Sequence, residues 1–367
     1  MTSTAEWKEL ESKYYMFLVR RQPMVLEKGE GARVWDVDGK EYLDFTSGWA
    51  VNNAGHSNPV IAEAIAEQAK TLVQTSNQFY TIPQLKLAEI LVENSCLDKI
   101  FICNSGAEAN EGAIKLASAY QKIVGQNKRT KIVCFENSYH GSTFLNYNLG
   151  DGLFGDPFYT LKPYDQVIKL KKDFDISSID WSEVMCIIVE TCSYSQTLQP
   201  NTEQFWNKLT QLQKQGVVLI LDDIFIGGGK TGSFVGWYRL PVKPDIFTMG
   251  KAITAGFFPL SATMYGPRID EVLPDNFDWE HGFTYNFSQA GILSTLKYID
   301  LLHEEMPFEL HYTLKERATF IFKEAGYDIV GHFGLIFDVK RKEDRQFFVI
   351  PINATDEYFD ILKEQLK

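Results

Sequence analysis

Short apolar runs alternate with longer stretches of helical periodicity through the middle of the chain. Four runs are apolar almost throughout and end in polar residues: KIFICNS (99–105), KIVCFEN (131–137), MCIIVET (185–191) and VVLILDD (217–223). Strands that are apolar on both sides are typical of parallel sheets covered by helices on both faces. The pattern therefore predicts an α/β fold.

The polar residues that end these runs are candidate site residues. They read Asn104-Ser105-Gly106, Glu136-Asn137, Glu190 and Asp222-Asp223. Ligands of open parallel sheets bind at the carboxyl ends of the strands, so these side chains should converge on one edge. Acidic strand ends also occur as plain caps, and the pattern alone leaves both interpretations open.

Two local elements are expected before the first of these strands. VWDVDGKEYLDF (34–45) predicts a hairpin, because two alternating strands flank the turn pair Asp38-Gly39. NPVIAEAIAEQAKTLV (58–73) carries apolar residues at helical spacing behind Asn58 and Pro59, which suit a cap and a first turn.

Composition narrows the class of protein. The 367 residues are 45% hydrophobic and 23% charged, which is ordinary for a globular protein. The 36 basic against 48 acidic residues give a formal net charge of −12, the wrong sign for binding nucleic acid or anionic lipid. The chain has no long apolar run and its N-terminus is charged, so we expect a cytoplasmic protein. Its five cysteines lack CxxC spacing, so we expect reduced thiols and no metal.

The segment SGAEANEGAIKLA (105–117) is a candidate phosphate site. Ser105 and Gly106 end a strand, and a good helical sequence follows at once. The start of a helix offers backbone N–H groups and a positive dipole end, which suit a phosphate. A tight turn with a helix cap would have the same sequence.

GGGKTG (227–232) does not match a nucleotide-triphosphate loop. That loop requires glycine five positions before the Gly-Lys pair, and position 224 is isoleucine. Two carboxylates, Asp222 and Asp223, also precede the segment, where a phosphate would be repelled.

Asp222 and Lys251 are candidates for heterocycle and carbonyl chemistry. Asp222 closes an apolar strand, so its carboxylate needs a cationic partner such as a protonated ring nitrogen. Lys251 follows the short apolar strand of PDIFTMGKAITAGFFP (244–259), where an amine can be desolvated enough to attack a carbonyl. Neither residue would be convincing alone, because most lysines are solvated surface groups.

Together the segments resemble the class III aminotransferases of the fold-type I pyridoxal-phosphate enzymes, nearest the acetylornithine and ornithine aminotransferase branch. The resemblance runs in order over about residues 25–290. Its motifs are GEGARVWDVDGKEYLDF (29–45), AVNNAGHSNP (50–59), TSNQFYTIPQ (75–84), CNSGAEANEGAIKLA (103–117), FENSYHGST (135–143), IIVE (187–190), LILDD (219–223), GGGKTG (227–232), PDIFTMGKAITAGFFP (244–259) and HGFTY (281–285).

The resemblance implies pyridoxal 5′-phosphate as cofactor and a homodimer. Asp222 would keep the ring nitrogen protonated, and Lys251 would form the Schiff base and then move the proton as general acid and base. Tyr139 and Ile224 would pack on the two faces of the ring. The implied cofactor contacts are Ser105, Gly106, Ala107, Tyr139, His140, Glu190, Asp222, Ile224, Lys251 and, from the neighbouring subunit, Thr284.

The resemblance also implies an architecture. We expect a large domain with a mostly parallel sheet covered by helices, and a smaller α+β domain built from both termini. The expected bounds are 1–50 for the N-terminal segment and hairpin, 51–290 for the cofactor domain and 291–367 for a shortened C-terminal part.

Several residues that read the substrate in relatives differ here. The family's switch glutamate is Ser195, the arginine of its His-Gly-Arg-Thr motif is Ser142, and the glutamine of its Asp-Glu-Val-Gln motif is Phe225. These changes predict weaker binding of glutamate and 2-oxoglutarate unless Arg20, Arg21 or Arg345 compensates. The candidate substrate contacts are Trp49, Arg20, Arg21, Ser142, Tyr194 and Phe225.

The leading hypothesis is an aminotransferase that moves an amino group from an amino acid or amine to a 2-oxo acid or aldehyde. Elimination, replacement or decarboxylation with the same cofactor is the alternative within enzymes. A relative that holds the cofactor or the dimer fold without catalysis is the alternative outside them.

Overall fold

The structure of the chain is a computed structural model. It describes residues 3–16, 21–150, 165–192, 198, 200–275, 277–304, 308–342 and 344–366. Within these residues, no helix is both long and apolar enough to cross a membrane.

The largest described sheet has seven strands in the order β4-β10-β9-β8-β7-β5-β6. Only β10 runs antiparallel to its neighbours; the other strands share one direction. This confirms the predicted mostly parallel sheet and brings the carboxyl ends of the four apolar runs to one edge. The strands are β4 (Lys99–Cys103), β10 (Ser261–Tyr265), β9 (Ile246–Met249), β8 (Val218–Asp222), β7 (Val184–Glu190), β5 (Lys131–Phe135) and β6 (Val167–Leu170).

Helices cover both faces of this sheet, which explains why β7 and β8 are buried along their whole length. On one face α5 packs over Ile188 and Ile220, while on the other α7 packs over Val189 and Leu221. The described α-helices are α1 (Thr4–Tyr14), α2 (Ser47–Ala50), α3 (Pro59–Thr71), α4 (Ile82–Glu93), α5 (Gly106–Ile123), α6 (Phe144–Asn148), α7 (Glu203–Lys214), α8 (Pro267–Asp270), α9 (Gln289–Glu304), α10 (Phe308–Glu324) and α11 (Asp356–Gln365).

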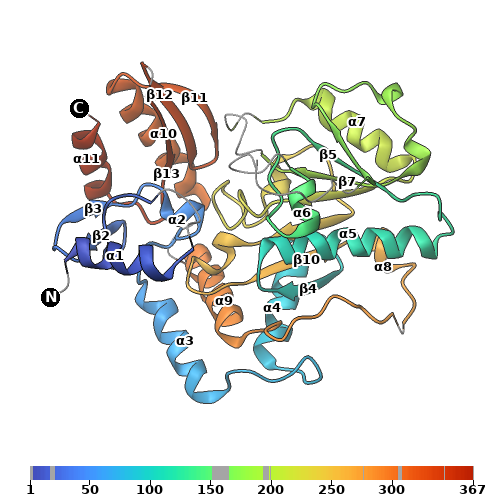
Figure 1. Cartoon of the computed structure of the whole chain (residues 1–367), viewed down its shortest axis with the longest axis horizontal. Helices are drawn as coiled ribbons and strands as arrows, with labels where there is room; N and C mark the ends of the chain where they lie inside the picture. Colours follow the sequence, from blue (N-terminus) through green and yellow to red (C-terminus); the bar gives the residue numbers. More distant parts are fainter. Residues whose placement is uncertain are drawn as a thin grey trace.

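Two small antiparallel sheets lie beside the large one, and the elements from both chain ends gather there (Figure 1). The first contains the predicted hairpin, whose turn holds Gly39 at a φ of +82°. A backbone contact joins the two ends, since the Val349 amide donates to the Phe45 carbonyl at 2.7 Å. The strands are β1 (Leu26–Glu30), β2 (Arg33–Asp36) and β3 (Glu41–Leu43), then β11 (Asp328–Phe333), β12 (Ile336–Arg341) and β13 (Asp344–Val349).

The helix predicted over 58–73 is α3. Its cap is Asn58, whose side-chain oxygen accepts from the Val60 amide at 3.1 Å, and Pro59 occupies the first turn. Short 3₁₀ turns complete the described elements: Ile176–Ser178, Trp181–Glu183, Gly236–Arg239 and Lys251–Thr254.

Candidate functional site

Three hydrogen bonds hold the Asp222 side chain at the carboxyl end of β8. Its Oδ2 accepts from Asn110 Nδ2 at 2.8 Å and from His140 Nδ1 at 2.8 Å, and its Oδ1 accepts from the Ile224 amide at 3.0 Å. The side chain is buried, so these three donors replace water. A carboxyl group held in this way has one fixed orientation at the sheet edge.

Lys251 begins a 3₁₀ turn directly after β9 and has a left-handed backbone, with a φ of +48°. Such a backbone is strained for a residue with a Cβ and is typical of functional positions. Burial lowers the pKa of Lys251, while the charges of Asp222 and Glu190 act in the opposite direction. The ammonium nitrogen lies 5.5 Å from the centre of the Phe225 ring. Lys251 is therefore a desolvated amine facing an aromatic ring.

The start of α5 faces the same edge. Ser105 caps the helix: its hydroxyl accepts from the Glu108 amide at 3.2 Å, and the Glu108 carboxylate accepts in return from the Ser105 amide. A Cβ on Gly106 would come within 2.8 Å of Ile224 Cδ1. A larger residue at position 106 would therefore force the Ile224 side chain to shift.

Tyr139, Ser142 and Ala107 lie together beside this helix end. The Tyr139 hydroxyl and Ser142 Oγ are 3.1 Å apart. A Cβ on Gly141, whose φ is +123°, would come within 2.7 Å of the Ala107 methyl. The segment after β5 therefore folds back against the first turn of α5 and carries Tyr139 with it.

Glu190 ends β7 in direct register with Asp222 on β8, and both are buried. Burial lowers the pKa of Lys251 and also that of Lys172, which follows β6, and the charge of Glu190 partly opposes this shift in both lysines. Lys172 is a basic residue of this edge that the sequence analysis did not single out.

The structure describes the predicted substrate contacts Trp49, Phe225 and Ser142. Trp49 is exposed and has a left-handed backbone, with a φ of +67°, inside α2. Phe225 packs against Phe347 of β13 at a ring-centre distance of 5.9 Å, so a residue of the C-terminal sheet reaches this region. Ser142 is exposed. Tyr194, like Ser195, lies outside the described residues.

Two of the three predicted compensating arginines, Arg21 and Arg345, have other partners. Arg21 pairs with Glu11 of α1 at 2.6 Å and lies over the Tyr15 ring. Arg345 donates from Nε to Asp338 Oδ1 at 2.8 Å and makes a second bond to the same carboxylate. Arg20 lies outside the described residues.

Thr284 is exposed in a segment tied to residues 72–85. Gln74 donates to the Thr284 carbonyl at 2.6 Å, and Asn77 donates to the Phe283 carbonyl at 3.3 Å. These two segments carry exposed apolar side chains: Leu72, Val73, Phe79, Tyr80, Ile82, Leu85 and Tyr285.

Two buried ionisable residues, Asp223 and Lys230, lie behind Asp222 in roles that the sequence pattern did not predict. Asp223 accepts from the Gly236 amide at 2.8 Å, and burial raises its pKa to about 7. Lys230 is fully buried, and its ammonium donates to the carbonyls of Gly227 at 2.6 Å and Ala50 at 3.2 Å. The lysine of GGGKTG thus holds backbone together rather than facing a ligand.

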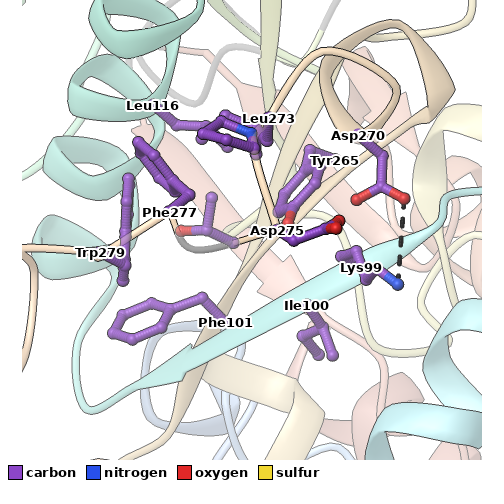
Figure 2. A pocket seen from close by; sticks show the side chains of 12 residues that line it. Lys99, Ile100, Phe101, Leu116, Tyr265, Asp270, Leu273, Asp275, Phe277 and Trp279 are labelled. Atoms are coloured by element: carbon purple, nitrogen blue, oxygen red, sulfur yellow. Dashed lines mark ion pairs between the residues drawn. The ribbon is translucent and has the colours of Figure 1, made fainter.

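A cavity of about 460 Å³ lies at the opposite end of β4, between that edge strand and the segment after α8. Figure 2 shows Phe101, Phe277 and Trp279 around it, with the Lys99 and Asp270 side chains paired at its rim at 3.9 Å. None of the candidate site residues lines it. The candidate site is therefore the strand-end cluster around Asp222 and Lys251.

The family model for Aminotransferase class-III matches residues 16–310. The chain belongs to the class-III aminotransferases. It is 35% identical over 304 residues to an acetylornithine aminotransferase of Methanocaldococcus jannaschii, covering 82% of this chain and 75% of that protein. It is 34% identical over 288 residues to a succinylornithine transaminase of Salmonella paratyphi A, covering 77% and 68% respectively.

Solved structures show the same fold. The ornithine aminotransferase from Toxoplasma gondii has a TM-score of 0.88 at 22% identity over 99% of this chain and 93% of that one. An omega-transaminase from Thermomicrobium roseum also has a TM-score of 0.88, at 23% identity over 100% and 98%. The chain is thus a fold-type I aminotransferase, and class-III aminotransferases are pyridoxal-phosphate enzymes.

The residues at the strand ends of this aminotransferase fit that cofactor. The half-buried Lys251 ammonium has no hydrogen-bond or ion-pair partner among the described residues, as suits an amine that bonds covalently to an aldehyde. Asp222 supplies a fixed negative charge, and the start of α5 supplies backbone N–H groups for a phosphate. The missing Cβ at Gly106 leaves room at the contact with Ile224.

Proposed function

We propose that this aminotransferase performs amino transfer with Lys251 and Asp222 as its catalytic residues. The observation that supports this most is the half-buried, desolvated Lys251 amine on the same sheet edge as an Asp222 held by three donors. When bound, pyridoxal phosphate supplies an aldehyde carbon that takes the amino group and a ring that withdraws electrons from the reacting C–H bond.

The chain's own residues would divide the remaining work. Ser105, Gly106 and Ala107 bind the phosphate, and Tyr139 and Ile224 hold the ring between them. Lys251 Nζ takes the proton from the substrate carbon and returns it. Its lowered pKa favours this role, because a neutral amine is needed to accept a proton.

His140 and Glu190 act beside these residues. His140 Nδ1 and Asn110 Nδ2 orient the Asp222 carboxylate, so that its charge faces the ring nitrogen rather than rotating. Glu190, at the end of β7, would contact the cofactor beside Asp222 of β8.

We propose an amino acid with a second amine, of the acetylornithine or ornithine type, as donor and a 2-oxo acid as acceptor. The names of the relatives support this class. Trp49 and Phe225 would contact the carbon chain of the donor, and Ser142 together with Tyr194 would replace polar contacts found in relatives.

We propose a homodimer in which Thr284 reaches the phosphate site of the neighbouring subunit. The exposed apolar residues around Thr284 support this, since Tyr80 is 87% and Ile82 is 72% exposed in the single chain. Contiguous apolar surface of this kind is typical of protein interfaces. We place the dimer in the cytoplasm, where the five free thiols would stay reduced.

Spectroscopy tests the proposed function. The purified protein with pyridoxal phosphate should show a visible absorption band that shifts when an amino donor is added, and a 2-oxo acid should restore it. A screen of donors with chemical identification of the product separates amino transfer from elimination or decarboxylation. A spectrum that no amino compound changes would contradict the proposal.

Peptide mapping tests the role of Lys251. Borohydride reduction of the loaded protein should label Lys251 and leave Lys230 unlabelled. Lys230 is a stringent internal control, because it is fully buried and close to Asp223, but two carbonyls already accept its protons. A label on Lys230 or on any other lysine would show that the assignment is wrong.

A further inference from the structure

The turn that carries Trp49 is strained. All four residues of α2 have a left-handed backbone, with φ values of +48°, +58°, +67° and +61° in chain order. Only Gly48 adopts this backbone without a steric cost, so the other three residues disfavour it. Such strain persists only where the surroundings hold it, and it is typical of functional segments. Contacts from outside the turn must therefore maintain it.

Two charged side chains hold the two ends of this turn. At its start Asp44 Oδ2 accepts from the Gly48 amide at 3.1 Å and also pairs with His56 Nε2 at 2.9 Å. At its end the Lys230 ammonium donates to the Ala50 carbonyl at 3.2 Å. Lys230 and Ala50 are both fully buried, so water would not replace this donor if it were removed.

The GGGKTG loop also packs against the turn of Lys251. A Cβ on Gly228 would come within 2.8 Å of the methyl group of Ala252, the residue after Lys251. The same loop therefore contacts two turns with left-handed residues, of which one carries the reacting amine and the other carries Trp49.

The Trp49 turn also borders the candidate site. The side chain of Ala50 belongs to the same buried apolar cluster as Ile226, and Phe225 packs against this cluster. Phe225 is the ring whose centre lies 5.5 Å from the Lys251 ammonium nitrogen. Trp49 directly precedes Ala50 and is 61% exposed. The position of Ala50 therefore governs where the exposed indole stands relative to the site.

We propose that Lys230 is a positioning residue for the substrate: its ammonium holds the Ala50 carbonyl and so keeps Trp49 against the carbon chain of the amino donor. This inference rests on the proposed function, in which Trp49 contacts the donor. Without the Lys230 contact, the strained turn would relax towards a backbone that residues with a Cβ prefer. The indole would then leave its place, while Asp222 would keep its three donors, none of which comes from the GGGKTG loop.

The kinetic test compares Lys230→Met with Tyr298→Phe in the cofactor-loaded protein. Tyr298 is also fully buried, and its hydroxyl donates to the Gly228 carbonyl at 2.7 Å. Both variants thus remove a buried hydrogen bond of the same loop, but only one of them releases Ala50. Lys230→Met should raise KM for N-acetylornithine about tenfold or more, with kcat within about threefold. Tyr298→Phe should leave both constants unchanged, and Lys230→Arg, which keeps the charge and the donors, should restore KM.

A double variant shows whether Lys230 acts through Trp49. Trp49→Ala alone should raise KM by a similar factor. Added to Lys230→Met, it should raise KM by less than about twofold more, because the indole has already left its place. Fully additive losses would overturn the proposal. So would an unchanged KM in Trp49→Ala, an exposed substitution that is informative even if Lys230→Met does not fold.

Hydrogen exchange gives a readout that does not depend on turnover. In Lys230→Met the amides of Gly48, Ala50 and Val51 should exchange at least about tenfold faster, while those of β8 should exchange as in the original protein. Tyr298→Phe should leave exchange of residues 46–52 unchanged. Equal exchange of these residues in Lys230→Met and the original protein would overturn the proposal. A protein in which no amino compound shifts the spectrum would refute the proposed function, while hydrogen exchange would still decide whether Lys230 holds the turn.

Discussion

Replacing Asp222 by asparagine tests both the stability and the chemistry of the site. Asn110 cannot turn its amide to suit the change, because its Oδ1 accepts from Thr248 and its Nδ2 also donates to the His140 carbonyl at 2.9 Å. In one orientation the new amide group would face Asn110 Nδ2 and His140 Nδ1, and in the other it would face the Ile224 amide. Each orientation leaves a buried donor facing another donor.

The magnitude follows from these contacts. A buried donor without an acceptor costs about 1–3 kcal/mol, and a hydrogen bond to a neutral oxygen is about 1 kcal/mol weaker than one to a carboxylate. Removing a buried negative charge offsets part of this loss. We therefore expect Asp222→Asn to lower the free energy of unfolding of the cofactor-free protein by about 1–3 kcal/mol.

The chemical effect should be larger. A neutral amide cannot keep the ring nitrogen protonated, so the rate of breaking the substrate C–H bond should fall at least 100-fold while the cofactor still binds. Urea unfolding followed by tryptophan fluorescence measures the first effect, and stopped-flow single turnover measures the second. Asp270→Asn is the control, because Asp270 lies far from the strand ends and makes only a 3.9 Å pair with Lys99, for which we expect less than about 0.5 kcal/mol.

Two results would refute this reasoning. A single-turnover rate within tenfold of the original, a barrier change of about 1.4 kcal/mol, would show that Asp222 does not support the ring nitrogen. An unchanged urea midpoint in Asp222→Asn would show that the three donors do not depend on its charge.

Three further outcomes are expected. Gly106→Ala should weaken cofactor binding by about 1–3 kcal/mol in a dialysis assay, because the new methyl would lie 2.8 Å from Ile224 Cδ1. The double variant with Ile224→Val should recover part of this loss. The pH midpoint for reaction of the cofactor-free protein with pyridoxal phosphate should lie below 10.5, since burial lowers the pKa of Lys251. Glu190→Gln should lower this midpoint further, because it removes a charge that stabilises the Lys251 ammonium. An upward shift in Glu190→Gln would contradict this prediction. Tyr80→Asp should convert the dimer to monomers in light scattering and reduce cofactor retention, whereas a dimer that survives would place the interface elsewhere.

The sheet and its strand-end acid could be predicted because they depend on local sequence. β8 is buried at every position, and a strand buried on both faces leaves an unbroken apolar run that ends visibly at Asp222. The helix cap at Ser105 also depends on local sequence, because Glu108, three residues later, completes it.

The partners of Asp222 could not be predicted from local pattern. His140 lies 82 residues away and Asn110 lies 112 residues away, and both contacts follow from how α5 packs on the sheet. The signal for Asn110 was its polar side chain on a face of α5 that is mostly apolar.

Lys172 and Lys230 illustrate two other limits. Lys172 stands in the charged sequence KLKKDFD, which resembles a solvated loop, and only the strand order, with β6 two strands from β7, brings it to the same sheet edge as Glu190. Lys230 was conspicuous in GGGKTG, but the sequence showed only that it does not form a nucleotide loop. Its partners, Ala50 and Gly227, are backbone carbonyls that no side-chain pattern reveals.

The position of Lys230 also sets an order for folding during synthesis. Its ammonium contacts a carbonyl 180 residues earlier, while its own carbonyl accepts from His311, which is 81 residues later, and from the Leu335 amide. In a ribosome-bound chain that has just completed the large sheet, the Lys230 carbonyl therefore still lacks its donors His311 and the Leu335 amide. The Phe45 carbonyl at the end of the N-terminal hairpin likewise lacks its donor, the Val349 amide, until the C-terminal sheet has been made. Chains stalled before Leu335 should consequently depend on chaperones, even though their cofactor residues have already been made.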